Sequence, residues 1–248
     1  MALALCIAAA LTWTGSASAK DSGKGTQDAP QAKAIRASLA KQLPNLPAID
    51  SVLATPMAGL FEVRFGGSDI LYTDAAGDFL IQGSLIDLKA KRNITEARVT
   101  ELSAIAFDEL PLKDAFVIKR GTGARKIAVF EDPNCSYCKR FEQGLATLDN
   151  ITVYVFLYPI LGADSVKKSQ AIWCAKNPGK AFEDWMLDGV QPDTSKAASC
   201  NTDALTRNTA FGQRNKIQGT PAIFFADGSR VPGAISPEEV EKRLAAIQ

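Results

Sequence analysis

Two cysteines three positions apart are the residues of this sequence best suited to chemistry. Residues 127–141 read IAVFEDPNCSYCKRF, so Cys135 and Cys138 follow directly after an apolar run. A pair at this spacing can be a structural disulfide, half of a metal site, or a dithiol that exchanges disulfides with other proteins. The surrounding residues and the rest of the chain have to distinguish these three roles.

The position of the pair favours an exchanging dithiol. An apolar strand before the pair and a helix after it place Cys135 at a helix N-terminus, where unpaired N–H groups and the helix dipole favour an anion. We therefore expect Cys135 to be the acidic, attacking thiol. Cys138 lies one turn further along, and we expect it to be the shielded thiol that resolves a mixed disulfide.

The two other roles fit the sequence poorly. A disulfide across three residues closes a very small loop and constrains the unfolded chain little. A zinc site needs four ligands, but the remaining candidates, Cys174 and Cys200, are far apart and the chain contains no histidine. We expect neither a metal nor a cofactor.

Composition excludes several other functions. The 248 residues are enough for two ordinary domains, and the balance of 28 basic to 27 acidic side chains gives no field for nucleic acid or anionic lipid. We expect no nucleic-acid partner. Without histidine the usual general base and the Cys–His nucleophile pair are missing, whereas a thiolate is itself a nucleophile.

The first residues resemble an export signal. Residues 1–19, MALALCIAAALTWTGSASA, combine an apolar stretch too short to span a bilayer with small residues before a cleavage site after Ala19. Cys6 lies within this signal peptide, so four cysteines remain in the mature chain. An even number in an exported protein indicates an oxidising compartment and disulfides, with three possible connectivities.

The next part of the chain predicts a small α+β domain over residues 30–91, after a flexible N-terminus at residues 20–29. A short amphipathic helix runs from Pro30 to about Leu43, with one apolar face. That face carries Ala34, Ile35 and Leu39. Short alternating runs separated by turn residues then predict an antiparallel meander. Its strands are expected at residues 51–55, 60–65, 69–73 and 79–88.

Residues 92–110 predict a linker helix between two domains. Asn93 is the expected N-cap, with Glu96 three positions later, and the run up to Pro111 contains few breakers. A helix of roughly sixteen residues would be about 24 Å long. Such a helix would hold the two domains apart.

Residues 111–248 alternate strands with helices, which predicts an α/β domain. Strands are expected at residues 116–120, 126–131, 151–159 and 222–226. Helices are expected from the cysteine pair to about Leu148, at residues 165–175, 180–187 and 202–216, and from Ser236 onward. The last helix opens with Ser-Pro-Glu-Glu, which combines an N-cap with a proline at the first helical position.

A proline at the entrance of the last apolar strand is the second chemical signal. In the run QGTPAIFF, Pro221 removes a hydrogen-bond donor from the strand, which an ordinary strand would not favour. A cis Thr220–Pro221 peptide would turn the backbone outward and leave Thr220 free to pair with an extended substrate. Alone, this dipeptide would indicate an ordinary trans proline. Together with the upstream cysteine pair it predicts a cis-proline loop.

Three motifs in this order, FEDPNCSYCKRF, AIWCAKNPGKAF and GTPAIFFADGSRVPG, resemble the catalytic domain of the DsbC-type periplasmic protein disulfide isomerases. That domain has a thioredoxin fold with a helical insertion. The segment LYTDAAGDFLIQGSLIDL resembles the cystatin-like dimerisation domain of the same family, which a linker helix follows. The resemblance extends over residues 30–248.

The resemblance implies a V-shaped homodimer in the periplasm that isomerises and reduces incorrect disulfides in exported proteins and has chaperone activity. Its partners would be misoxidised exported proteins and a membrane thiol reductase of the DsbD type. Cys135 would be the nucleophile and Cys138 the resolving thiol. Residues Ser136, Tyr137, Thr220 and Pro221 would contact the substrate.

The chain departs from the family pattern at two places. Ser136-Tyr137 stands between the cysteines where the isomerases usually have Gly-Tyr, so the redox potential does not follow from the resemblance. Val129 occupies the position, six residues before the first cysteine, at which thioredoxin has a buried acid. Glu131 and Asp132 are interpreted as a solvated strand end or helix-entry turn, so the proton acceptor for Cys138 is left unnamed.

Cys174 and Cys200 are the two remaining cysteines of the mature chain, and they are expected to form a structural disulfide with each other. Closing that loop should stabilise the chain by about 3.5 kcal/mol on the chain-entropy estimate. A second exchanging pair is the alternative. The sister group DsbG has a similar architecture but typically lacks this bridge.

Three functions remain to be distinguished. The first is a disulfide isomerase and reductase. The second is a monomeric thiol oxidase, which residues 30–91 disfavour because a dimer would shield the dithiols from a membrane oxidant. The third is a DsbG-like reductase or a holdase that binds unfolded chains through apolar surface.

Overall fold

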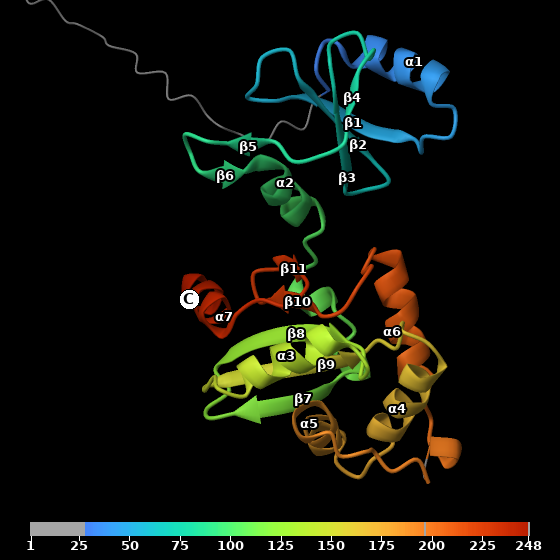
Figure 1. Cartoon of the computed structure of the whole chain (residues 1–248), viewed down its shortest axis with the longest axis vertical. Helices are drawn as coiled ribbons and strands as arrows, with labels where there is room; N and C mark the ends of the chain where they lie inside the picture. The colour runs from blue at the N-terminus through green and yellow to red at the C-terminus, as the bar shows by residue number, and fades with distance from the viewer. Residues whose placement is uncertain (1–27, 196, 248) are drawn as a thin grey trace, which may run out of the picture.

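The smaller part of the molecule is an antiparallel sheet with one helix against it. The computed structural model describes residues 28–195 and 197–247, so the predicted signal peptide lies outside the described residues. The strands β1 (Ile49–Ala54), β2 (Phe61–Phe65), β3 (Asp69–Thr73) and β4 (Leu80–Ile81) follow each other in sheet order. This meander confirms the predicted pattern, and Figure 1 shows it above the rest of the chain.

Helix α1 (Ala32–Gln42) covers this sheet with one apolar face. Its buried residues are Ala32, Ile35 and Leu39, which pack with Val52 and Val63 of the sheet. The sequence-based expectation that Ala34 belongs to this face is wrong, because Ala34 is exposed. Positions three and seven residues apart lie on the same side of a helix, so Ala32 takes the place expected for Ala34.

The run at residues 79–88, expected as one strand, forms two short ones. Strand β4 pairs with β3, whereas β5 (Ile86–Asp87) pairs with β6 (Arg92–Asn93) in a separate ribbon. The chain changes direction between them. There the N–H of Leu85 donates a hydrogen bond to the hydroxyl oxygen of Thr95 at 2.8 Å. The apolar character of this run therefore does not reflect burial, since Phe79 is 74% exposed.

Helix α2 (Ile94–Leu102) leads from the smaller part to the larger one (Figure 1). The predicted N-cap is confirmed, because Asn93 Oδ1 accepts the N–H of Glu96 at 3.1 Å. The helix is shorter than the roughly sixteen residues expected. After Leu102 the chain turns so that Phe107 and Leu110 become buried against the larger sheet. Burying these two side chains stabilises more than continuing a solvated helix would.

The segment after α2 is irregular apart from two 3₁₀ turns, η1 (Phe107–Glu109) and η2 (Leu112–Asp114). It is fixed to the larger part at its start, where the Ile105 N–H donates to the Gly228 carbonyl at 3.1 Å. The division of the chain at residues 30–91, 92–110 and 111–248 stays a prediction.

The larger part is built on a five-stranded mixed sheet of order β11-β10-β8-β9-β7. Strands β8 and β9 are parallel, and the other neighbours are antiparallel. The strands are β7 (Phe116–Arg120), β8 (Arg125–Glu131), β9 (Ile151–Leu157), β10 (Ala222–Phe225) and β11 (Arg230–Pro232). The first four confirm predicted strands. Strand β11 was not predicted, because it has only three residues and follows β10 after a connection of four residues.

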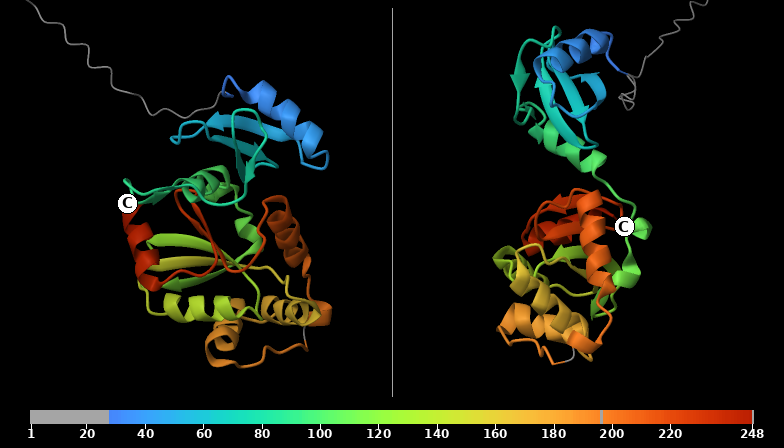
Figure 2. Two further views of the ribbon diagram at one scale, coloured as in Figure 1. Left: turned by 45° about the horizontal axis from the view of Figure 1, so that its top comes forward. Right: turned by 90° about the vertical axis from the view of Figure 1, so that its right-hand side faces the viewer.

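Helices cover both faces of this sheet, as the two views of Figure 2 show. They are α3 (Ser136–Leu145), α4 (Ala163–Trp173), α5 (Pro178–Asp188), α6 (Asp203–Arg214) and α7 (Pro237–Ala246), with a 3₁₀ turn η3 (Ala197–Ser199). Alternate side chains of β8 point to opposite faces of the sheet. Ile127 and Val129 pack with α3, α5 and α7, whereas Ala128 and Phe130 pack with the residues around η1 and α6. In the described ranges, no helix combines the length and apolarity needed to cross a membrane.

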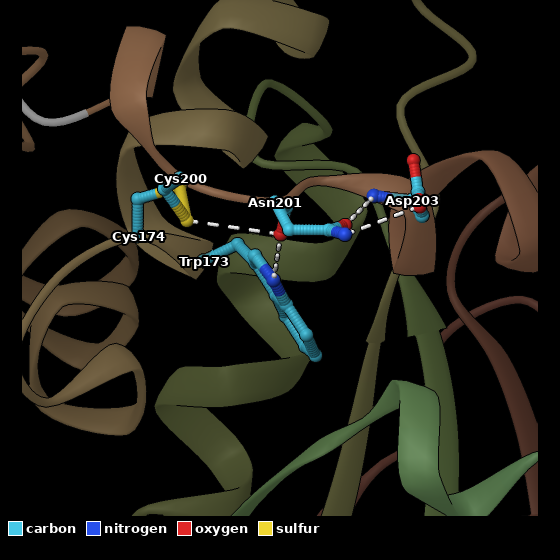
Figure 3. Close-up of a disulfide and its surroundings, with 5 residues drawn as sticks. All are labelled: Trp173, Cys174, Cys200, Asn201 and Asp203. Carbon is cyan, nitrogen blue, oxygen red and sulfur yellow. Dashed lines mark hydrogen bonds between the residues drawn. A yellow bond between two sulfur atoms is a disulfide. The ribbon is translucent and has the colours of Figure 1, made fainter.

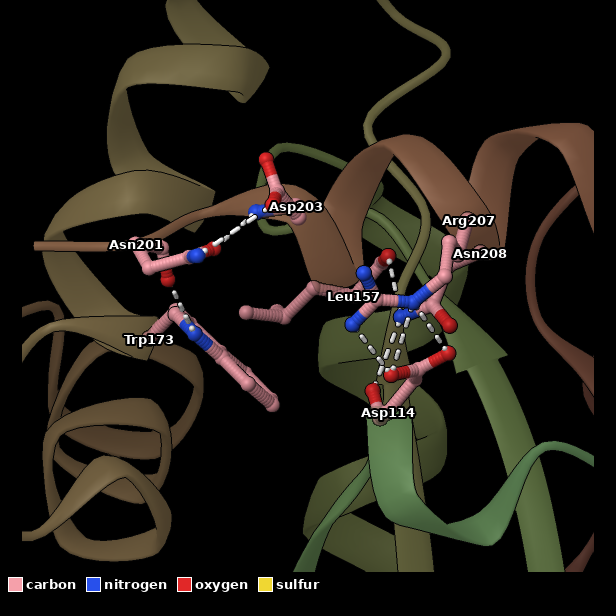
Figure 4. A network of polar contacts seen from close by, with 7 residues as sticks. All are labelled: Asp114, Leu157, Trp173, Asn201, Asp203, Arg207 and Asn208. Carbon is pink, nitrogen blue, oxygen red and sulfur yellow. Dashed lines mark hydrogen bonds and ion pairs between the residues drawn. The ribbon is translucent and has the colours of Figure 1, made fainter.

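A polar network ties α6 to the sheet (Figure 4). Asp114, which is 1% exposed, accepts hydrogen bonds from Arg207 Nε at 2.9 Å and Nη2 at 2.7 Å. Asn208 donates to the carbonyls of Asp114 at 3.0 Å and Leu157 at 3.3 Å. Because a buried carboxylate needs a partner, this network fixes where α6 lies relative to the end of β9.

The Cys174–Cys200 disulfide is confirmed (Figure 3). It joins the end of α4 to the segment before α6, with Cα atoms 5.8 Å apart. Trp173 donates from Nε1 to the Asn201 carbonyl at 3.1 Å, which holds the same two segments together. The disulfide therefore closes the helical insertion that contains α5.

Removing this disulfide should reduce stability without changing the fold. The Cys174→Ala/Cys200→Ala variant should lose about 3.5 kcal/mol of unfolding free energy, because the unfolded chain is no longer restricted by the loop. Urea unfolding of the parent and the variant measures this difference. Val190→Ala, an exposed change in the same loop, is the matched control and should stay within about 0.5 kcal/mol of the parent. A double variant as stable as the parent would contradict the structural role.

Candidate active site

The cysteine pair lies at the start of α3, just after strand β8, as predicted. Val129 and Phe130 are fully buried in the sheet, and a turn of three residues separates β8 from Cys135. Cys135 is the N-cap of α3, with an extended backbone at φ −76° and ψ 117°. Its sulfur accepts the N–H of Cys138 at 3.4 Å. The sulfur therefore occupies the place of a helix-capping oxygen.

The turn before Cys135 is held by the buried carboxylate of Asp132. Its Oδ1 accepts the N–H of Asn134 at 2.8 Å and the hydroxyl of Ser165 at 2.7 Å. Its Oδ2 accepts the N–H of Leu161 at 2.9 Å. These donors come from both sides of the site, so one carboxylate sets the position of the turn relative to α4.

The interpretation of Glu131 and Asp132 as a solvated strand end is wrong, since both are fully buried. The chain after β9 crosses the end of β8 and covers it. The N–H of Tyr158 donates to the carbonyl of Glu131 at 2.7 Å, and Leu161 and Ser165 bind Asp132. No local residue pattern predicts this covering, because it depends on the tertiary path of residues far along the chain.

Trp185 of α5 supports the same turn from the opposite side. Its Nε1 donates to the Pro133 carbonyl at 2.6 Å, and the side chain is 8% exposed. Lys139 and Lys168 lie over the indole, with their Nζ atoms 3.8 Å and 4.9 Å from the ring centroid. Trp185 of α5 thus holds the cysteine turn by a direct hydrogen bond and packs against two lysine side chains.

The environment of Cys135 favours its thiolate. A hydrogen bond from the Cys138 side chain lowers the pKa of Cys135 most, against the opposing effect of burial. The Thr220 side chain and the amides of Cys138 and Tyr137 lower this pKa further, to about 5. Donors aimed at one sulfur from a helix N-terminus are the arrangement that makes a cysteine nucleophilic near neutral pH.

The environment of Cys138 has the opposite effect. This thiol is fully buried, and burial raises its pKa far above the usual value for cysteine. The hydrogen bond to Cys135 and the nearby charge of Glu131 raise the pKa of Cys138 further. Two cysteines three positions apart therefore have different reactivity, with one acidic thiol at the helix end and one protonated thiol below it.

The predicted cis-proline loop lies against Cys135. The Thr220–Pro221 peptide is cis, and the Cys135 thiol contacts the Thr220 carbonyl at 3.3 Å. Ala222 begins β10 and pairs with Phe130 at the end of β8. Two segments far apart in sequence are thus brought together because β10 and β8 are neighbours in the sheet.

The residues between the cysteines face outward. Ser136 is exposed, and Tyr137 is 60% exposed, with the Arg140 guanidinium 5.6 Å from the Tyr137 ring centroid. Of the other two residues predicted to contact substrate, Thr220 lies against the Cys135 sulfur through its carbonyl, and Pro221 is buried. Their contact with substrate stays a prediction.

A pair of buried carboxyl groups that was not predicted lies next to the dithiol. Glu131 and Glu142 are 0% and 1% exposed, and the Glu131 carboxyl interacts with both Glu142 and Cys138. Glu142 is four residues after Cys138 in α3, so the helical period was the available signal. Within the described ranges, no group of three or more His, Cys, Asp or Glu residues is placed to hold a metal ion.

The acidity of Cys135 can be titrated directly. We expect its alkylation rate and its thiolate absorbance to rise with pH around a midpoint of about 5. Folding lowers this pKa from an ordinary value near 9, so the thiolate stabilises the folded dithiol form above pH 9 and this contribution is lost as the pH falls through about 5. Between these values the unfolding free energy of the dithiol form should rise with pH relative to a Cys135→Ser variant. A titration midpoint near that of free cysteine would contradict the assignment.

Two family models match the chain in succession. Residues 26–96 match the disulfide bond isomerase protein N-terminal domain, and residues 112–248 match a thioredoxin-like domain. A crystal structure of a disulfide interchange protein from Neisseria gonorrhoeae is similar over 55% of this chain and 97% of its own, with 32% identity and a TM-score of 0.51.

Curated relatives are similar over both parts. A probable thiol:disulfide interchange protein DsbC of Bordetella parapertussis is 45% identical over 215 residues, covering 87% of this chain and 75% of the relative. The thiol:disulfide interchange protein DsbC of Escherichia coli is 34% identical over 197 residues, covering 76% and 78%. From the matched N-terminal and thioredoxin-like parts, the chain belongs to the DsbC family of thiol:disulfide interchange proteins.

Proposed function

We propose that the protein isomerises and reduces incorrect disulfides of exported proteins in the periplasm, with Cys135 as the nucleophile and Cys138 as the resolving thiol. The observation that carries this proposal is the difference between the two thiols. Cys135 has a pKa of about 5, whereas burial keeps Cys138 protonated. The names of the relatives support exchange of thiols and disulfides as the reaction.

The reaction begins when the Cys135 thiolate attacks one sulfur of a substrate disulfide. The substrate S–S bond breaks, a mixed disulfide forms, and the other substrate sulfur leaves as a thiolate that takes a proton from solvent. If another substrate thiol then attacks the mixed disulfide, a new substrate disulfide forms and the Cys135 thiolate returns. No electrons are gained or lost overall, so this path is isomerisation.

Reduction follows when Cys138 attacks Cys135 before the substrate rearranges. The Cys135–Cys138 disulfide forms, and the substrate leaves with both sulfurs reduced. The dithiol has then given two electrons to the substrate disulfide. We propose that a membrane thiol reductase of the DsbD type restores the dithiol, which a protein acting repeatedly as a reductase requires.

Substrate would lie along the cis-proline loop. In this proposal the backbone of Thr220 pairs with an extended substrate segment, while Ser136 and Tyr137 contact it from the helix side. Pairing through the backbone accepts many sequences. It therefore suits a protein that acts on a range of misoxidised chains.

Replacing the nucleophile should abolish isomerisation. Cys135→Ala should reactivate a scrambled multi-disulfide enzyme no faster than buffer containing a low-molecular-weight thiol, because no thiolate remains to open the substrate disulfide. Recovery of the enzyme's activity over time is the measurement. Cys138→Ala, the matched variant, should retain part of the isomerisation but accumulate mixed disulfides. Reactivation by Cys135→Ala at the parent rate would refute the proposed function.

We propose a homodimer formed through the smaller part. In the described sheet, β4 lies at one edge with β3 as its neighbour, and the residues around it are unusually exposed. Phe79, Leu80 and Ile81 are 74%, 42% and 51% exposed. An apolar sheet edge with free backbone groups favours pairing with another strand, and a second copy of this chain is the proposed partner.

Charges on this edge should weaken the dimer. For Leu80→Lys/Ile81→Lys we expect the dissociation constant to rise at least about tenfold, which corresponds to about 1.4 kcal/mol. Sedimentation equilibrium over a range of concentrations measures it. Val117→Lys, an exposed position on β7, is the control and should leave the constant unchanged. An unaffected dimer, or a monomeric parent, would exclude this edge as the interface.

A chaperone activity is the second function we propose. A cavity of about 1030 Å³ lies between the two parts, and it is lined in part by apolar side chains from β3, α2 and β11. Examples are Leu71, Val99 and Val231. Such a space suits binding of unfolded segments without chemistry. The Cys135→Ala/Cys138→Ala variant is assayed for suppression of the aggregation of an unfolded protein, beside the isomerase assay. Suppression by this variant separates holding of unfolded chains from thiol–disulfide exchange.

A further inference from the structure

Two carboxyl groups buried beneath the dithiol have no structural explanation. Glu131 ends β8 and Glu142 lies in α3, with exposures of 0% and 1%. In the described structure none of their four carboxyl oxygens has a hydrogen-bond partner. A buried carboxylate without donors is costly to ionise, so such groups are retained where they serve another purpose.

The pair connects the resolving thiol to a cation. On one side the Glu131 carboxyl interacts with the Cys138 thiol and, through its charge, with Cys135. On the other side Glu142 Oε2 lies 4.0 Å from Nη2 of Arg120 on β7. The groups therefore follow one another in the order Cys138, Glu131, Glu142 and Arg120.

The contact with Arg120 is a poor structural ion pair. The same Nη2 atom of Arg120 donates to Glu183 of α5 at 2.8 Å, and Arg120 Nη1 has no hydrogen-bond partner. A 4.0 Å approach without a hydrogen bond does not compensate for burying Glu142. Stability alone therefore does not account for Glu142.

Burial sets the number of protons that the pair holds. Burial raises the pKa of Glu142 to about 7, while Glu131 and Arg120 lower it and Glu183 raises it. Burial also raises the pKa of Glu131 well above its ordinary value, and the charges of Glu142 and Cys135 raise it further. Two carboxyls in one buried site do not both ionise readily. Above about pH 7 the pair therefore keeps one proton and can accept a second.

We propose that the Glu131–Glu142 pair accepts the proton of Cys138 when this thiol resolves the mixed disulfide. This inference rests on the proposed function. Within the pair, Glu131 interacts with the Cys138 thiol, so it takes the role of the proton acceptor. Glu142 is a positioning residue that acts through Glu131. The pair replaces the acid that is missing at Val129, from the next position of β8 on the same face of the sheet.

Protons and electrons are conserved in this step. The Cys138 proton moves to Glu131, whose own proton moves to the Glu142 carboxylate beside Arg120. The Cys138 sulfur forms a bond to the Cys135 sulfur, and the bond between Cys135 and the substrate sulfur breaks. The substrate sulfur leaves as a thiolate and takes a proton from solvent. The dithiol loses two electrons, and the substrate disulfide gains them.

A single-turnover reaction separates this step from the first attack. The dithiol form is mixed with excess bis(nitrocarboxyphenyl) disulfide, whose thiolate product absorbs visible light. A first phase, dependent on reagent concentration, reports attack by Cys135. A second phase, independent of concentration, reports resolution by Cys138. In the parent, the rate of the second phase should fall as the pH drops through about 7.

Glu131→Gln should slow the second phase about 10²-fold more than the first, the usual contribution of a positioned base. It should also remove the dependence on pH near 7. Glu142→Gln should shift that dependence, since the remaining carboxyl titrates without its partner. Glu109→Gln, at an exposed position, is the matched control and should reproduce the parent in both phases. A Glu131→Gln protein with the parent's second-phase rate and pH profile would overturn the proposal.

An infrared measurement on the parent protein tests the same proposal without the Glu131→Gln variant, in case that variant does not fold. Oxidation of the dithiol should perturb the carbonyl stretch of a protonated carboxyl group, because the pair gains or loses a proton with Cys138. Absence of any such change would also overturn the proposal. Both experiments follow only the reactions of Cys135 and Cys138 and need no protein substrate. A failure of the proposed isomerase function would therefore appear only in the scrambled-enzyme assay.

Discussion

The stabilisation of one sulfur anion at the start of α3 is the interaction on which the rest of the site depends. Cys135 takes the place of a helix N-cap, so the helix amide of Cys138 points at its sulfur at 3.4 Å. Cys138, one turn later in the same helix, is fully buried, and burial outweighs the one backbone hydrogen bond, from Asp132, that favours its thiolate. A single strand–turn–helix unit thereby produces one thiol with a pKa of about 5 and one that stays protonated.

Much of the surrounding structure keeps that unit in place. The turn is held by Asp132 through Leu161 and Ser165 on one side and by Trp185 on the other. The neighbouring strand β10 brings the cis-proline loop to the same sulfur. Several of these groups are polar and fully buried, an arrangement that costs stability in an ordinary core. The hydrogen bonds that these groups make hold the turn in one position relative to α4 and α5.

The connection between the two parts follows a different rule. Helix α2 is well capped but ends early, because the side chains beyond it gain more from the larger sheet than from a longer helix. Lys216 and Asp69 form an ion pair at 2.7 Å between the two parts, with both side chains partly exposed. Exposed pairs of this kind contribute little in water. The buried residues around η1 therefore do most to anchor the linker to the larger part.

Local patterns in the sequence determined the elements and the reactive pair. The apolar run into Cys135, the Asn93 cap and the proline before β10 act over a few residues, where backbone geometry and hydrogen bonding follow from residue type. Tertiary structure alone decided what covers the end of β8, and so the burial of Glu131 and Asp132. It also decided where α2 ends and that residues 79–88 form two exposed strands. Burial depends on which distant segment packs against a residue, and polarity read along the chain does not contain that information.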